Sequence, residues 1–147
     1  MDKRYYTPLE LIEIATQHAM RADEFLRDIV TSNAMETVSD SSLQPIISLM
    51  YIAFETSLRA CLLQVQRPVK QPKNLSELLE LNRDLFFSSQ ELQLLKNLSR
   101  QHAFRKGIDY ELWENTRELL VFCSDILRLY EAMQKMMPLE LQRDYQQ

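Results

Sequence analysis

Glycine is almost missing from this chain, because Gly107 is the only one among 147 residues. Phosphate-binding loops of the GxGxxG and GK[ST] kinds need several glycines, so nucleotide binding of the Rossmann or P-loop kind is excluded. Proline is also sparse, with five residues in the whole chain. An all-β fold draws on both residue types at its many turns. The composition therefore favours helices.

Cysteine and histidine are equally scarce, with two of each. Cys61 and Cys123 each lie within an apolar helical pattern, which predicts two buried free thiols rather than a disulfide. His18 and His102 lie too far from the cysteines to give a zinc-ligand spacing, so no metal and no cofactor are predicted. No secretory leader and no apolar run long enough to cross a membrane is visible. These features predict a cytoplasmic protein that is not membrane-bound.

The remaining composition is that of an ordinary globular domain. Hydrophobic residues make up 46% of the chain and charged residues 26%, with a net charge of −4. A chain of this length can bury one proper core. We therefore expect a single domain over 1–147, with its core within 7–137 and a frayed tail at 138–147.

Helix signals follow one another along the whole chain. Thr7, Asn74 and Ser88 are each followed three residues later by a glutamate, which is the signature of a capped helix start. Apolar residues at helical spacing follow each start. The predicted fold is all-α, an antiparallel up-and-down bundle of about five helices. The expected helices cover 8–30, 42–66 (the most buried one), 75–87, 89–105 and 109–137.

The same spacing predicts the core. The last helix has the most regular stripe, with intervals that alternate between four and three residues from Leu112 to Met137. His18 lies on the apolar stripe of the first helix and is predicted to be structural. The residues predicted to form the core are Leu11, Ala15, Ala53, Phe54, Leu58, Leu95, Leu119, Cys123 and Ile126.

One window reverses the acidic balance of the chain. Residues 92–108 contain no acidic side chain, and they end beside the only glycine. One interpretation is a basic helix end, which complements the negative end of the helix dipole. Arginine also suits phosphate or RNA-backbone binding, because its donors form a planar fork. The candidate phosphate-binding residues are Lys96, Arg100, Arg105 and Lys106, with His102 lying between the two arginines.

Chemistry at this window depends on which side chains share a face. Arg100 and Arg105 diverge by roughly 140° on a continuous helix, and Arg100 and His102 by about 200°. Histidine is the usual general base near neutral pH, so His102 is a candidate catalytic residue together with Arg100. Glu55 and Arg59 lie four residues apart on the second helix. They form either a plain surface ion pair or a polar cluster that supports the site.

The chain resembles the HEPN superfamily of compact helical bundles. The resemblance covers about 7–137 and rests on the order of helices, on the segment Met50–Ala60, and on the segment Asn97–Gly107 before a long final helix. It implies a homodimer, without indicating its face; Tyr110 and Trp113 are the aromatic residues that we expect nearest to it. Catalytic members of the family are metal-independent ribonucleases. Others bind nucleotides or act as partner proteins, often beside a nucleotidyltransferase.

The family motif is an arginine, a polar residue, a few variable positions and a histidine. Arg100 and Gln101 match its first half, whereas Arg105 stands where the histidine is expected. We therefore predict a non-catalytic HEPN-like protein that binds RNA, a nucleotide or a partner protein through the basic window. Two alternatives stay open. One is an active ribonuclease of the toxin–antitoxin kind that uses Arg100 and His102; the other is a helical interaction module with no nucleic-acid role.

Overall fold

The structure is a computed structural model that describes residues 6–31, 39–65 and 74–142. This part of the chain is all-α, with five α-helices, one short 3-10 helix and no strand. The helical bundle predicted from the sequence is confirmed. The helices are α1 (Pro8–Thr31), α2 (Asp40–Gln64), α3 (Leu75–Leu81), α4 (Ser89–Ala103), α5 (Thr116–Gln134) and η2 (Leu139–Leu141).

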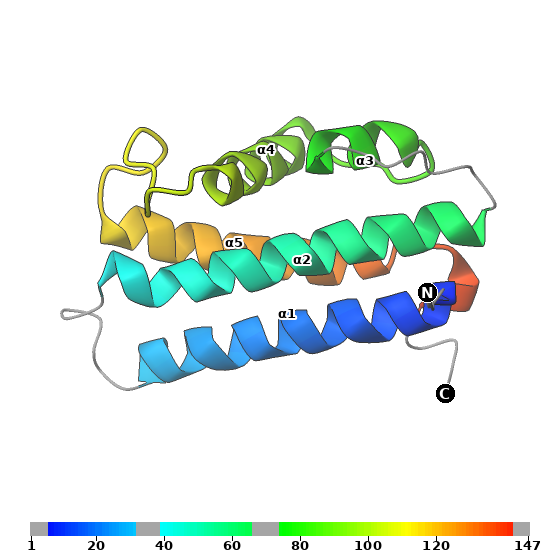
Figure 1. The fold of residues 1–147 in the computed structure, drawn as a ribbon, viewed down its shortest axis with the longest axis horizontal. Coiled ribbons are helices and arrows are strands. Elements are labelled where there is room, and N and C mark those ends of the chain that lie inside the picture. Colours follow the sequence, from blue (N-terminus) through cyan, green and yellow to red (C-terminus); the bar gives the residue numbers. More distant parts are fainter. Residues whose placement is uncertain (1–5, 32–38, 66–73, 143–147) are drawn as a thin grey trace, which may run out of the picture.

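The long helices run alternately in opposite directions (Figure 1). Helix α1 runs against α2, and α4 runs against α5. The short helix α3 lies beside α4, so that the two together cover one side of α2 (Figure 1). Helix α2 packs against all four other α-helices and is the centre of the bundle. The prediction that it is the most buried helix is confirmed.

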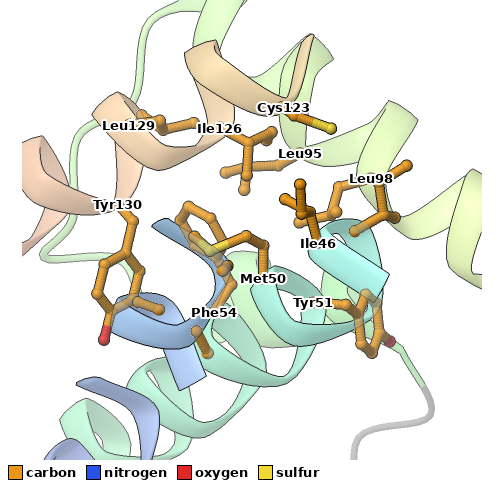
Figure 2. Packing of buried hydrophobic residues seen from close by; sticks show 14 of the residues in the cluster. Ile46, Met50, Tyr51, Phe54, Leu95, Leu98, Cys123, Ile126, Leu129 and Tyr130 are labelled. Atoms are coloured by element: carbon orange, nitrogen blue, oxygen red, sulfur yellow. The ribbon is translucent and has the colours of Figure 1, made fainter. Parts of the chain in front are cut away.

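Large apolar side chains of α2 fill the main core (Figure 2). Phe54 is fully buried and meets Tyr130 of α5 edge-on, with ring centroids 5.3 Å apart. The Tyr130 hydroxyl pairs with Ser57 at 3.0 Å, so the buried polar atoms of both residues are satisfied. Each large apolar side chain buried in this way contributes roughly 1.5–3 kcal/mol to folding.

The predicted core residues are buried, with one exception. Leu11 is half-buried and packs on a smaller second cluster. Cys61 and Cys123 are both buried free thiols, as predicted, and burial raises the pKa of each to about 12. His18 is half-buried and its Nδ1 lies 2.8 Å from the carbonyl oxygen of Ile14, a contact within its own helix.

Three helix starts follow the predicted caps. Thr7 and Glu10 exchange side-chain and backbone hydrogen bonds at 3.0 and 3.1 Å, and Ser88 and Glu91 do the same at 2.7 and 3.1 Å. The Asn74 side chain accepts from the amide of Glu77. These bonds satisfy backbone N–H groups that have no partner within the helix.

The third helix is shorter than predicted, because it ends at Leu81 rather than near residue 87. The buried side chain of Asn82 donates to the carbonyl of Leu78 at 2.7 Å and to that of Leu58 on α2 at 3.3 Å. By bonding these two carbonyls, Asn82 ends the helix and fastens it to α2.

The last helix begins seven residues later than predicted, at Thr116 instead of Asp109, and it ends at Gln134. Asn115 is its N-cap and accepts from the amide of Glu118 at 2.9 Å. The start at residue 109 was wrong because the apolar spacing continues through a cap. The fourth helix also ends early, at Ala103, so Gly107 lies in the following loop and does not cap it; the φ of Gly107 is +106°.

The expected frayed tail is partly wrong. Leu139–Leu141 form η2, and Leu141 is fully buried against Ile12 and Met137. The side-chain amide of Gln142 holds this turn, because it donates to the backbone carbonyls of Met137 and Lys135. The rest of the tail lies outside the described residues. So do most of the connection after α1, the predicted helix end at Gln66 and the prolines that follow it.

Helix α2 is long and apolar enough to span a membrane by length and composition alone, with a mean hydropathy of 1.5 over its most apolar window. However, 61% of that window is buried within the bundle. This burial is typical of a central core helix.

Candidate functional site

The basic window lies at the end of α4 and in the loop that follows. Lys96 is exposed on α4, while Arg105 and Lys106 are exposed in the loop. Arg100 and His102 belong to the last turn of the helix, where positive charge complements the helix dipole. The window is therefore one continuous piece of chain, but its side chains point to different places.

Arg100 is held by two carboxylates of the following loop. Its Nε lies 3.0 Å from Oδ2 of Asp109, and its second guanidinium nitrogen (Nη2) lies 2.6 Å from Glu111. Asp109 is almost fully buried, and its other oxygen accepts from the amide of Glu111 at 3.1 Å. The charge of Arg100 is thus compensated within the chain, where it stabilises the loop.

The neighbouring Gln101 fastens the same loop. Its side chain is buried, donates to the carbonyl of Gly107 at 2.7 Å and accepts from the amide of Asp109 at 2.8 Å. The two hydrogen bonds that this buried side-chain amide makes, one donated and one accepted, fix the path of the chain on both sides of residue 108. The pair Arg100–Gln101, which matches the family motif, therefore acts structurally in this protein.

His102 faces helix α2 instead. Its imidazole lies flat on the ring of Tyr51, with centroids 3.7 Å apart and planes 4° from parallel. Glu55 lies one turn after Tyr51 on α2, where its carboxylate helps to raise the pKa of the tyrosine, and it pairs with Arg59 at 3.5 Å. The pair of Glu55 and Arg59 is half-exposed on α2, and the carboxylate of Glu55 also acts on the charge of His102. Sequence reasoning missed Tyr51, although its spacing of four residues from Glu55 was visible.

The imidazole is partly buried, and this partial desolvation shifts its pKa. Desolvation lowers the pKa of His102, the nearby Arg105 lowers it further, and Glu55 opposes both. An ordinary histidine titrates near 6.5, so His102 is neutral at pH 7. Burial, with the carboxylate of Glu55 adding to it, raises the pKa of Tyr51, which therefore keeps its proton.

A cleft of about 340 Å³ opens beside His102, between α2 and the end of α4. Its apolar base is the buried Ile47, and polar side chains surround it. We call this the His102 cleft. Its lining residues are Gln44, Ile47, Ser48, Gln101, His102, Phe104 and Arg105.

The structure brings His102 and Arg105 together and separates both from Arg100. Arg100 lines a different depression, of about 710 Å³, with Asp109 and Tyr110. Phe104 borders both depressions. Lys96 lines neither of them. The predicted site is therefore divided, and the candidate catalytic pair Arg100 and His102 is not assembled within one chain.

The two aromatic residues expected near an interface anchor the loop. Tyr110 is exposed, but its hydroxyl donates to Asp40 at the start of α2 at 2.6 Å, and Thr116 donates to the same carboxylate at 2.5 Å. The bond to Asp40 raises the pKa of Tyr110. Trp113 is buried against Phe122, with ring centroids 5.0 Å apart.

Comparison with protein-family models, with curated proteins and with solved structures finds no match for this chain. Within the described residues, no group of three or more histidine, cysteine, aspartate or glutamate side chains is placed to hold a metal ion. The function is therefore inferred from the chemistry of the His102 cleft.

Proposed function

We propose that the protein is a HEPN-like bundle that binds a phosphate-bearing ligand, an RNA or a nucleotide, in the His102 cleft without cleaving it. The observation that carries this proposal is the division of the basic window. Arg105 and His102 line the cleft, whereas Arg100 is bound by Asp109 and Glu111 on the other side. A nucleotidyltransferase-type partner belongs to the same proposal through the family resemblance, and a cytoplasmic location belongs to it through the two free thiols.

The cleft has the donors that a phosphate needs. Arg105 supplies a permanent charge and a planar fork of N–H groups. Ser48 and Gln44 add side-chain donors from α2, and the neutral imidazole of His102 adds one N–H. Tyr51 covers one face of that imidazole, and His102 as a residue is exposed. A nucleobase can therefore extend the stack, as bases do on histidine and other flat side chains.

Cleavage needs a general base and a group that stabilises the developing charge, both within reach of one phosphate. Arg100 is too well occupied by carboxylates to serve the cleft, and Arg105 stays protonated and is no base. Among the described residues that line the cleft, only His102 has a pKa suited to a general base. Binding without turnover is thus the function that this geometry supports best.

A binding assay with matched variants tests the proposal. The probe is a labelled single-stranded RNA followed by fluorescence anisotropy, with ATP and inorganic phosphate as competitors. We expect Arg105→Ala to weaken RNA binding by about tenfold or more and to reduce the salt dependence by about one phosphate contact. Lys96→Ala removes the same charge outside the cleft and serves as the control.

The competitors identify the ligand. If ATP displaces the labelled probe at a lower concentration than unlabelled RNA of equal nucleotide content does, the natural ligand is a free nucleotide. If unlabelled RNA displaces the probe at the lower concentration, the natural ligand is RNA. Equal losses in Arg105→Ala and Lys96→Ala would mean diffuse attraction and would contradict the proposal. RNA cleavage in the presence of a chelator, abolished by His102→Ala, would establish the ribonuclease alternative instead.

A further inference from the structure

The outer face of α5 carries a charge pattern that is complementary to itself. Arg117, Val121 and Asp125 are spaced by four residues and lie on one side of the helix, opposite the buried stripe. Val121 is 52% exposed at the middle of this row. Glu114 precedes the row and Arg128 follows it, both exposed. Seen from Val121, Arg117 mirrors Asp125 and Glu114 mirrors Arg128, whereas Glu118 faces no mirrored charge because residue 124 is a serine.

Arg117 and Asp125 are the charged side chains four residues before and after Val121. Among the described residues, neither Arg117 nor Asp125 makes an ion pair or a side-chain hydrogen bond. Arg128 makes one long hydrogen bond, of 3.4 Å, to Ser124. Two residues eight positions apart on a helix are separated by about 12 Å, so Arg117 cannot reach Asp125 within one chain.

An apolar groove lies beside the row. It occupies about 450 Å³ between α4 and α5 and has Leu94, Leu112 and Phe122 among its lining residues. Arg117, Glu118, Val121 and Asp125 of α5 also line it. An apolar floor with a charged rim is the usual composition of a protein interface.

We propose that this face of α5 binds the same face of a second copy of the chain, with the two α5 helices antiparallel about a two-fold axis at Val121. This inference goes beyond the proposed function and does not depend on it. The axis places Arg117 opposite the partner subunit's Asp125, and Glu114 opposite the partner subunit's Arg128. Two-fold symmetry repeats each pair, so four ion pairs surround one apolar contact.

The pattern also selects the antiparallel arrangement. A parallel pairing in register would place Arg117 against the partner subunit's Arg117, and Asp125 against the partner subunit's Asp125. Like charges in contact disfavour that arrangement. From Arg117 to Arg128 the row extends over about 17 Å of helix, which is long enough for two helices that cross at a shallow angle.

Charge reversal gives a direct test by sedimentation velocity at micromolar concentration. In Arg117→Glu, each pair becomes two carboxylates; in Asp125→Arg, each becomes two cations. We expect either variant alone to raise the dimer dissociation constant by about tenfold or more. Mixed together, the two variants restore both pairs between unlike subunits, so they should form a heterodimer. The double variant R117E/D125R should dimerise with itself.

Controls separate the interface from general charge effects. Arg27→Glu and Asp23→Arg alter an exposed ion pair on α1 and should leave the dimer unchanged. Circular dichroism confirms that each variant is folded. A wild-type chain that sediments as a monomer, single variants that remain dimeric, or single variants that fail to associate on mixing would each overturn the proposal.

A cysteine placed on the axis gives an independent readout. Val121→Cys places two thiols opposite each other, and oxidised glutathione should convert the chain to a disulfide-linked dimer. Because the native Cys61 and Cys123 are buried, we expect the new thiol at position 121 to be the one that reacts. Val30→Cys, also exposed, is the control and should give little cross-linked product. Equal cross-linking of both variants would contradict an axis at Val121.

Discussion

His102 lies flat against Tyr51 at 3.7 Å between ring centroids, although the two residues belong to different helices. This contact turns the imidazole toward α2, while Arg100, two residues earlier in the chain, turns toward the loop and its carboxylates. The two candidate catalytic side chains therefore lie on different sides of the last turn of α4. The two-residue spacing thus separates His102 from Arg100, and the stack holds the imidazole against α2.

The stack makes a prediction about pH. Because burial lowers the pKa of His102, its proton NMR titration should have a midpoint below the ordinary value of about 6.5. As the pH falls, the unfolded chain takes up this proton first, so His102 disfavours the folded state in acid.

Phosphate affinity should rise as the folded imidazole becomes charged. His18→Gln removes the second imidazole signal, and Tyr51→Ala, which uncovers the ring, should raise the midpoint. A midpoint at or above 6.5 in the parent chain would refute this.

The core makes a prediction about stability. Ile126 is 1% exposed at the centre of the α5 stripe, so Ile126→Asp places a carboxylate among apolar side chains. We expect a loss of several kcal/mol or failure to fold. Val30→Asp introduces the same charge at an exposed position and should have little effect. Chemical denaturation followed by circular dichroism measures both, and comparable stabilities of the two variants would contradict the assigned core.

Most of the fold was predictable because its signals are local. Capping residues such as Thr7 and Ser88 bond to amides three positions away, and the apolar spacing that follows marks the buried side. The start of α5 was missed for the same reason. Leu112 continues the apolar spacing of the helix although Asn115 caps it, and periodicity alone does not distinguish a cap inside such a run.

The candidate site was less predictable because its contacts are not local. The basic window was visible in the sequence as a lack of acidic residues. However, the carboxylates that bind Arg100 belong to the loop after α4, and the path of this loop depends on Gln101. The stacking of His102 on Tyr51 requires the packing of two helices. The divergence of Arg100 and His102 follows from their spacing, whereas the groups that each side chain meets follow from the packing.

Gly107 makes a prediction about the loop. A Cβ added there would meet no atom within 4 Å, but the φ of +106° is one that L residues rarely adopt. Gly107→Ala should therefore cost about 1–2 kcal/mol through the backbone alone. The control is Ala103→Gly, which introduces a glycine at the exposed end of α4 instead of removing one. It should lower the free energy of unfolding by less than about 1 kcal/mol. Thermal unfolding compares them, and a neutral Gly107→Ala would contradict the backbone conformation of the loop.

The last prediction separates the two arginines. Arg100→Ala leaves the buried Asp109 without its cation, so we expect a loss of about 1–2 kcal/mol, moderated because Arg100 is half exposed. Adding Asp109→Asn removes the unpaired charge and should restore part of that loss.

Arg105→Ala should do the opposite, with unchanged stability and weakened phosphate binding, because Arg105 lines the cleft and forms no ion pair among the described residues. Urea unfolding and phosphate competition, measured on the same preparations, distinguish the two roles. If Arg100→Ala abolished binding at unchanged stability, Arg100 would be a ligand residue as the sequence pattern predicts, and the division of the basic window would be wrong.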